Sequence, residues 1–223
     1  MSTDESSDAN PLLLAPIPEG TVGFGLAEMT YLASRGTGDA ARLSRDFLGL
    51  KDADERISFL AASALTARGF LTGHPNGDLE VRASAALLQL ALGTATRWTR
   101  VGVLSRTGDP AVVYVLQGPA LVAMVEPAAL ATWWATIGTD PDQGPTLVAA
   151  LLQRRLESRP GDACIVDSRG LTTGRHNLLV TREADGSLSA AKDVEAGGAG
   201  GVPTALPAGG LAELVAAVMA AGS

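Results

Sequence analysis

The chain has 223 residues, of which 46% are hydrophobic and 18% charged, so it can build a substantial core and is not expected to be disordered as a whole. Its formal net charge is −7, with acidic residues in excess in both halves, which argues against a nucleic-acid backbone as the main partner. One cysteine and two histidines exclude a disulfide framework and a Cys/His zinc site.

The first residues carry no targeting pattern. The opening ten hold three acidic side chains and neither lysine nor arginine. A secretory signal starts with positive charge followed by an apolar run, so residues 1–11 are expected to form a solvated tail. No stretch reaches the roughly 18 consecutive apolar residues of a membrane-spanning helix. We therefore expect a cytoplasmic protein with no membrane insertion.

Residues 12–96 are expected to form a mainly helical part. Its clearest helix starts near Asp52, whose spacing to Glu55 suggests a capping box, and it continues with apolar side chains at helical spacing as far as Leu65. Two further helices are predicted at 26–34 and 83–92.

A short hairpin is predicted between the last two of these helices, because 70–72 and 79–81 flank a cluster of turn-forming residues. Helix, hairpin and helix together have the outline of a winged helix. This outline leaves open an alternative function, a transcriptional regulator that binds DNA or a small effector. However, the helix that would read DNA begins with three acids within 52–55, and the turn 73–78 has no lysine or arginine. Nucleic-acid binding is therefore not expected.

Residues 97–223 are expected to form a mostly antiparallel sheet flanked by helices, in one compact unit with the preceding part. The predicted strands are 98–104, 111–116, 121–125, 163–167, 176–181 and 188–193. The predicted helices are a short one at 127–137, one starting at Pro145, and a last one from Leu211 to Met219. The expected fold class is α+β.

No catalytic or metal-binding signature is present. Cys164 lies in an apolar strand segment, where a thiol behaves as a small hydrophobe. His74 lies in a turn and is expected to be exposed, whereas His176, close in sequence to Asp167, is the first candidate if chemistry exists. A Ser/His/Asp set can be assembled from any chain of this length, however, so it indicates little. Acidic pairs such as Asp140 and Asp142 read as solvated turns. We predict a non-enzymatic protein without cofactor or metal.

Two features suggest contact with a protein partner. Trp133 and Trp134 are adjacent, so in a helix they point about 100° apart and in a strand to opposite faces. One of them can fill the core while the other anchors a partner, since tryptophan is enriched at interface hot spots. The glycine-rich segment 196–203 is expected to be a flexible loop. The candidate partner-binding residues are Trp133, Trp134, Gly197, Gly198, Gly200 and Gly201.

The order of elements carries a resemblance. The helix and hairpin at Leu65–Leu79 contain Ala-Arg-Gly-Phe-Leu and Gly-Asp-Leu, and a later strand ends in Ile-Val-Asp at 165–167, followed by Gly174-Arg175. In this layout, over most of residues 20–221, the chain resembles the EspG-type chaperones of actinobacterial type VII (ESX) secretion. The resemblance implies a cytoplasmic chaperone or adaptor for small helical secreted proteins, bound in a helix-in-groove mode. It assigns no site residue, and homodimer formation stays open.

Overall fold

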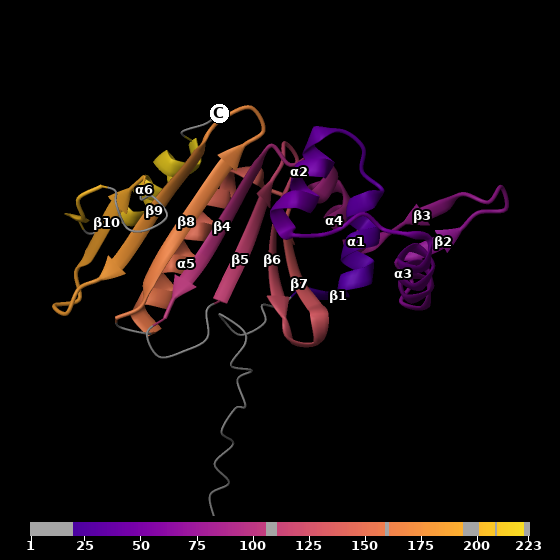
Figure 1. The fold of residues 1–223 in the computed structure, drawn as a ribbon, viewed down its shortest axis with the longest axis horizontal. Coiled ribbons are helices and arrows are strands. Elements are labelled where there is room, and N and C mark those ends of the chain that lie inside the picture. Colours follow the sequence, from indigo (N-terminus) through magenta and orange to yellow (C-terminus); the bar gives the residue numbers. More distant parts are fainter. Residues whose placement is uncertain (1–19, 106–110, 159–160, 194–200, 208, 221–223) are drawn as a thin grey trace, which may run out of the picture.

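The protein has an α+β fold (Figure 1). The computed structural model describes residues 20–105, 111–158, 161–193, 201–207 and 209–220. The strands are β1 (Val22–Gly25), β2 (Leu71–Gly73), β3 (Leu79–Val81), β4 (Arg97–Leu104), β5 (Ala111–Gln117), β6 (Val122–Ala128), β7 (Thr132–Gly138), β8 (Ala163–Gly170), β9 (Arg175–Arg182), β10 (Leu188–Lys192) and β11 (Thr204–Ala205). The helices are α1 (Leu26–Ser34), α2 (Asp39–Leu48), α3 (Glu55–Ala67), α4 (Ala83–Thr94), α5 (Gly144–Ser158) and α6 (Gly210–Ala220).

One large antiparallel sheet organises the molecule. Its strand order is β1-β7-β6-β5-β4-β8-β9-β10-β11, while β2 and β3 form a separate hairpin. Strands β4 to β7 and β8 to β10 each run as a meander, and the pairing of β4 with β8 joins the two halves. Strand β1 comes from the region expected to be helical, and it forms the edge of the sheet beside β7.

The two faces of the sheet are buried at opposite ends. Side chains alternate along each strand, so in β4 Trp98 points to one face and Val101 to the other. Helices α1, α2 and α4 pack on the first face over β5, β6 and β7, whereas α5 and α6 pack on the opposite face over β4, β8 and β9 (Figure 1). Two hydrophobic cores therefore lie on opposite sides of one continuous sheet.

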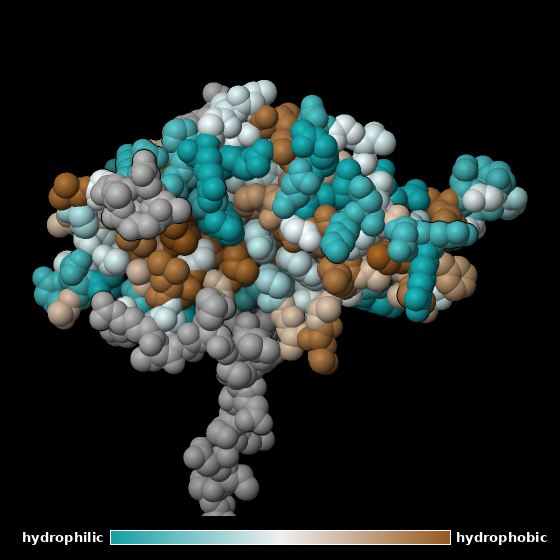
Figure 2. All heavy atoms as spheres, in the orientation of Figure 1, coloured by the Kyte–Doolittle hydropathy of each residue, from teal (hydrophilic) through white to brown (hydrophobic). Residues whose placement is uncertain are grey.

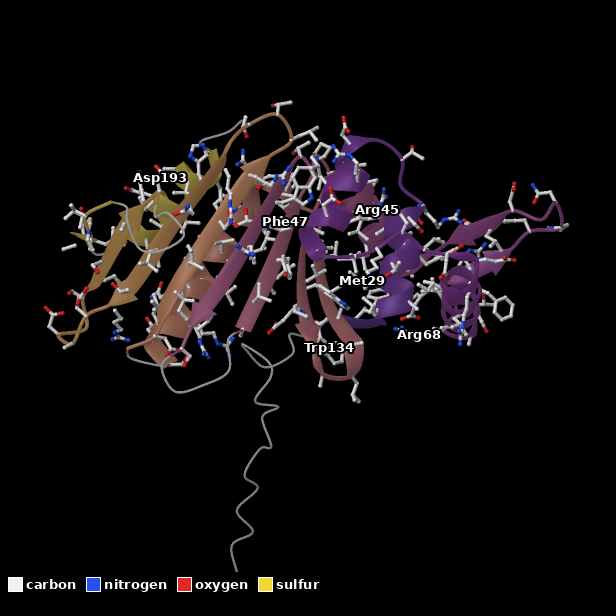
Figure 3. All side chains as sticks on the ribbon, in the orientation of Figure 1. Met29, Arg45, Phe47, Arg68, Trp134 and Asp193 are labelled. Carbon is white, nitrogen blue, oxygen red and sulfur yellow. The ribbon has the colours of Figure 1, made fainter. Side chains whose placement is uncertain are left out.

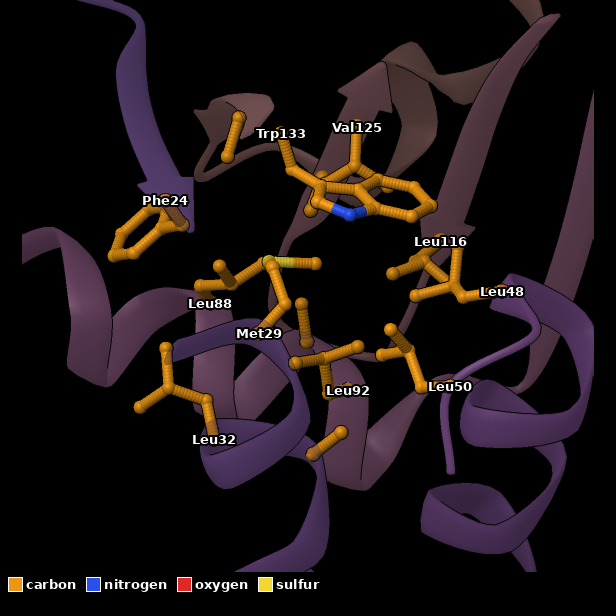
Figure 4. Packing of buried hydrophobic residues seen from close by; sticks show 14 of the residues in the cluster. Phe24, Met29, Leu32, Leu48, Leu50, Leu88, Leu92, Leu116, Val125 and Trp133 are labelled. Carbon is orange, nitrogen blue, oxygen red and sulfur yellow. The ribbon is translucent and has the colours of Figure 1, made fainter. Parts of the chain in front are cut away.

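The first core is built around Met29 of α1, which lies between the sheet and the helices (Figure 4). Trp133 of β7 packs against it from the sheet side, and Leu92 of α4 from the helix side. Trp98 is fully buried, and its indole Nε1 donates a hydrogen bond of 2.9 Å to the Ser44 hydroxyl of α2. This bond satisfies a buried polar group and fixes α2 on the sheet.

Helix α3 and the β2–β3 hairpin extend from one end of the molecule as an arm (Figure 1). The predicted hairpin is confirmed, but α3 buries only Ala61 and Leu65, and Leu60 of the expected apolar stripe is 52% exposed. The helix is capped by Asp54, whose carboxylate accepts the Ile57 N–H, rather than by Asp52. An arm has few neighbours to cover a helix, so an apolar stripe there remains partly open.

Two other expectations were wrong. Helix α2 was not predicted, although its buried Ala41 and Leu48 follow helical spacing, because charged side chains interrupt a short segment. The helix expected at 127–137 is instead the hairpin of β6 and β7. The run of threonine, tryptophan and isoleucine in β7 favours a strand. Pro127 lies in the part of β6 that pairs with β7 alone, because the pairing with β5 ends at Val125, and proline is tolerated where a strand has only one neighbour.

None of the described helices is both long and apolar enough to cross a bilayer.

Candidate partner-binding surface

Part of one face of the sheet is not covered by any helix of the described residues. This part comprises β8, β9 and the adjoining segments of β4 and β5 around Gly102 and Val112, on the side opposite α5 and α6. The apolar side chains on this face, Val112, Ile165 and Leu179, are half-buried and belong to neither core. We call this surface the open face, and Figure 2 shows hydrophobic side chains gathered there over β8 and β9.

The apolar residues of the open face form a row across four strands. The register aligns Val112 of β5 with Gly102 of β4, Gly102 with Ile165 of β8, and Ile165 with Leu179 of β9. Gly102 shapes this row, because a Cβ there would come within 3.1 Å of the Ile165 Cγ2. The Ile165 side chain therefore lies across the glycine, and the row forms a low apolar floor.

A charged cluster lies beside the apolar row. Asp167 of β8 is 7% exposed and accepts hydrogen bonds from Arg175 at 2.7 Å and Arg100 at 2.9 Å. The hydrogen bonds that Arg175 donates to Asp167, together with the negative charge of Asp167, raise the pKa of Arg175 above its ordinary value. Two arginines around one carboxylate leave a net positive charge, and Arg169, aligned with Arg175, lies on the same face.

The opposite end of the open face runs into a cleft of about 780 Å³. It is lined by Leu104 and Ala163 and by the turn that joins β9 to β10. Glu183 and Asp185 lie in this turn, and hydrogen bonds from Ser187 lower the pKa of Asp185. The open face is therefore basic at one end and acidic at the other.

Aromatic residues border the open face on the side of α2. The ring of Phe47 in α2 meets the Tyr114 ring of β5 edge-on at 5.5 Å, and Tyr114 lies 5.9 Å from the Trp133 ring in the first core. Figure 3 shows Phe47 where α2 approaches the sheet. Helix α2 thus forms a wall along the open face, and Tyr114 links this wall to the core.

The tryptophan pair is split between the two sides of the sheet. Trp133 is 8% exposed and belongs to the first core, so its ring is not available to a partner. Trp134 is half-buried on the opposite side, where its ring lies against Gly23 of β1. Of the predicted glycines, Gly201 is exposed next to the backbone of Lys192. The other three, Gly197, Gly198 and Gly200, lie outside the described residues.

The residues considered for chemistry are not brought together. Asp167 and Ser168 are adjacent in β8, and His176 is aligned with Ser168, so His176 and Asp167 point to opposite faces of the sheet. The His176 Nδ1 lies 3.8 Å from the Asp193 carboxylate instead. His74 is exposed, as predicted, and contacts Glu80 at 3.1 Å.

Cys164 is fully buried in the second core, as predicted, and burial raises the pKa of its thiol to about 11. The positive charge of Arg155 partly opposes this increase. Because Arg155 and Cys164 are not close in the sequence, the sequence did not indicate this influence. A protonated, enclosed thiol is a poor nucleophile. Among the described residues, no group of three or more His, Cys, Asp or Glu side chains could hold a metal ion.

The sequence reading missed the open face itself. Its strands were predicted, but the run Ala111–Leu116 is apolar at every position, so the sequence does not show that Val112 lies on a face that no described helix covers. The available signal was that β5 and β8 carry apolar residues on both faces. That pattern is compatible with a second layer of this protein that covers the strands, or with a surface that binds another protein.

A scan against models of protein families and a search among curated proteins both found no match.

Proposed function

We propose that this protein is a non-enzymatic chaperone or adaptor that acts in the cytoplasm and holds a helical segment of another protein on the open face. The observation that carries the proposal is the row of half-buried apolar side chains across four strands, Val112, Ile165 and Leu179, on which no helix of the described residues packs. Burying each of these partly covered side chains contributes roughly 1 kcal/mol to binding.

The size of the open face suits a helix. The row from Val112 to Leu179 crosses three spacings between neighbouring strands, which corresponds to about 14 Å. A helix covers that length in about nine residues, or two to three turns. An amphipathic helix of this length offers one apolar stripe, which matches one apolar row.

The charges favour one orientation of the bound helix. Arg100 and Arg175 flank the apolar row on one side, and Glu183 and Asp185 flank it on the other, so a helix on the row fits best with acidic side chains along the first side and basic ones along the second. An acidic side chain of the partner near the two arginines adds an ion pair. We therefore expect the partner to be a helical protein with an acid next to its apolar stripe.

The resemblance to EspG-type chaperones supports the same class of partner, a small helical secreted protein of type VII secretion. A role without catalysis fits the positions of His176 and Asp167 on opposite faces of the sheet and the enclosed thiol of Cys164. The winged-helix regulator gains no specific support, because α3 starts with Asp54 and Glu55 where DNA would lie.

The test compares the tagged wild-type protein with Ile165→Lys and Arg175→Glu, each purified from cells of its source at moderate salt. The matched control is Phe59→Lys, since Phe59 is 73% exposed on the arm. We expect stoichiometric recovery of a small helical protein with the wild type and the control. Both open-face variants should lose it at least tenfold while keeping the wild-type circular dichroism spectrum.

The proposal would be overturned if the open-face variants recovered the helical protein as well as the wild type does, or if the wild type retained no helical protein. Binding to duplex DNA with an affinity that falls steeply as salt rises would instead favour the regulator.

A further inference from the structure

The turn between β6 and β7 is built from residues that its conformation disfavours. Leu130 and Ala131 have φ angles of 58° and 55°, both in the left-handed region, and the Thr132 N–H bonds the Ala129 carbonyl. Two successive left-handed residues are the mark of a type I′ turn, which prefers Asn-Gly. Residues with a Cβ are strained there.

Other turns of this chain show the usual solution. The β2–β3 turn uses Asn76-Gly77, and the β9–β10 turn uses Asp185-Gly186, with Gly77 and Gly186 both at a φ of 87°. The β6–β7 turn has no glycine at its left-handed positions, and its Leu130 side chain is 97% exposed. The turn thus combines backbone strain with an unburied apolar side chain, and neither stabilises the isolated protein.

A second apolar group lies on the same hairpin. Trp134 of β7 is half-buried on the side of the sheet away from the first core (Figure 3), four residues beyond Leu130. A Cβ at Gly23 would approach the Trp134 Cζ3 to 2.9 Å, so the glycine leaves space for the ring to lie along the sheet. In Figure 1 the turn extends past the end of β5, clear of the sheet.

We propose that the end of the β6–β7 hairpin is a second protein-docking element, in which Leu130 inserts into an apolar pocket of a folded protein partner and Trp134 packs against the rim of that pocket. A pocket of leucine size removes the exposed side chain from water, and this burial stabilises the complex while the turn keeps its strained conformation. This element is separate from the open face, so one chain can hold two proteins at once.

A membrane is the less suitable occupant. Residues 122–138 contain Glu126 and no lysine or arginine, so an anionic bilayer does not attract the hairpin. One leucine is also a small anchor, since even a myristoyl chain gives only marginal membrane binding. A second copy of the chain carries the same net charge of −7, which opposes close approach.

The test uses the double variant Leu130→Asn/Ala131→Gly in the full chain, which keeps the turn and replaces its residues with those that the turn favours. A benzophenone amino acid at position 129 serves as the photo-crosslinking probe in source cells. The crosslinked protein is identified by mass spectrometry, purified and titrated against the wild type and the variant. Val202→Asn is the matched control, because Val202 is an apolar residue 85% exposed in an irregular segment.

We expect a melting temperature that rises by about 2–4 °C in the double variant, because strain is relieved, together with an affinity at least tenfold lower. If Leu130 served folding alone, its replacement would not raise the melting temperature and weaken binding at the same time. Val202→Asn should change neither quantity. Ile165→Lys on the open face should leave this affinity unchanged, which separates the inference from the proposed function.

Three results would overturn the inference. One is crosslinking to other copies of the chain, with a dimer in sedimentation that the double variant abolishes. Another is flotation with vesicles of equal phosphatidylcholine and phosphatidylglycerol that depends on Leu130. The third is a crosslinked protein that binds the double variant as tightly as the wild type.

Discussion

Arg68, at the end of α3, donates hydrogen bonds to both carboxylate oxygens of Glu28 in α1, at 3.0 and 2.8 Å. Its guanidinium also lies 4.8 Å from the Phe70 ring centroid and 5.5 Å from that of Phe24. Glu28 is 5% exposed and accepts the Gly25 N–H at 2.7 Å. This pair fastens the arm to the body of the molecule.

Removing the ion pair of Arg68 and Glu28 should lower the free energy of unfolding. Arg68→Ala leaves the buried Glu28 carboxylate with the Gly25 N–H and without its cation, and we expect a loss of about 2–3 kcal/mol in the free energy of unfolding. Urea unfolding measures the difference. Arg42→Ala is the control, because the pairs of Arg42 with Asp39 and Asp46 are exposed and should contribute less than about 0.5 kcal/mol. Equal effects of the two substitutions would contradict the assignment.

A second ion pair lies inside the molecule, between Arg155 of α5 and Asp162 at 3.1 Å, with side chains 7% and 5% exposed. Asp162→Asn keeps the bond from the Ser105 hydroxyl but leaves the cation uncompensated. We expect a loss of about 3–5 kcal/mol, measured by chemical denaturation.

The double variant Arg155→Met/Asp162→Asn should recover part of that loss, because it removes the isolated charge. Among the described residues, the Arg155 Nε already has no hydrogen-bond partner, so the pair is imperfect before any substitution. A double variant that is less stable than Asp162→Asn would contradict the prediction and show that the Arg155 guanidinium stabilises the fold even without the Asp162 carboxylate, because methionine keeps most of the aliphatic part of the side chain.

Cys164 predicts a dependence on alkaline pH. Burial raises the pKa of its thiol from 9.0 to about 11, so between these values the unfolded chain has released a proton that the folded chain keeps. The free energy of unfolding therefore falls as pH rises, by about 1.4 kcal/mol per pH unit from this group. Unfolding curves of the wild type and Cys164→Ala from pH 8 to 11 measure it. Parallel pH profiles would refute the prediction.

Gly23 predicts a packing effect on Trp134. Gly23→Ala places a methyl group about where the ring lies, at 2.9 Å from Cζ3, and should displace the ring at a cost of about 1–3 kcal/mol. Because Trp98 and Trp133 are buried, the displaced ring should shift the tryptophan emission to longer wavelength. In Gly23→Ala/Trp134→Ala the penalty should largely disappear, and a penalty that persists would place the strain in the backbone of β1.

Local patterns in the sequence were sufficient for most elements. Helices α1 and α4, the β2–β3 hairpin and the strands of the second half follow from apolar spacing and turn residues within short windows. The expectation of an α+β fold with a mostly antiparallel sheet is confirmed. Local pattern failed where it was ambiguous, in the charged helix α2 and at 127–137, where pairing with β1 and β6 decides for a strand.

The candidate site could not be derived in the same way. Alternation along a strand separates Trp133 from Trp134 and Asp167 from Ser168, and this much is contained in the sequence. Which member of each pair is covered depends on where α2, α5 and α6 pack, and those contacts join residues far apart in the chain. The sequence determined the strands and their two-sided character. Only the tertiary structure, by placing helices on opposite faces at opposite ends, decided which apolar row stays open, because burial belongs to the packed layers and not to any single strand.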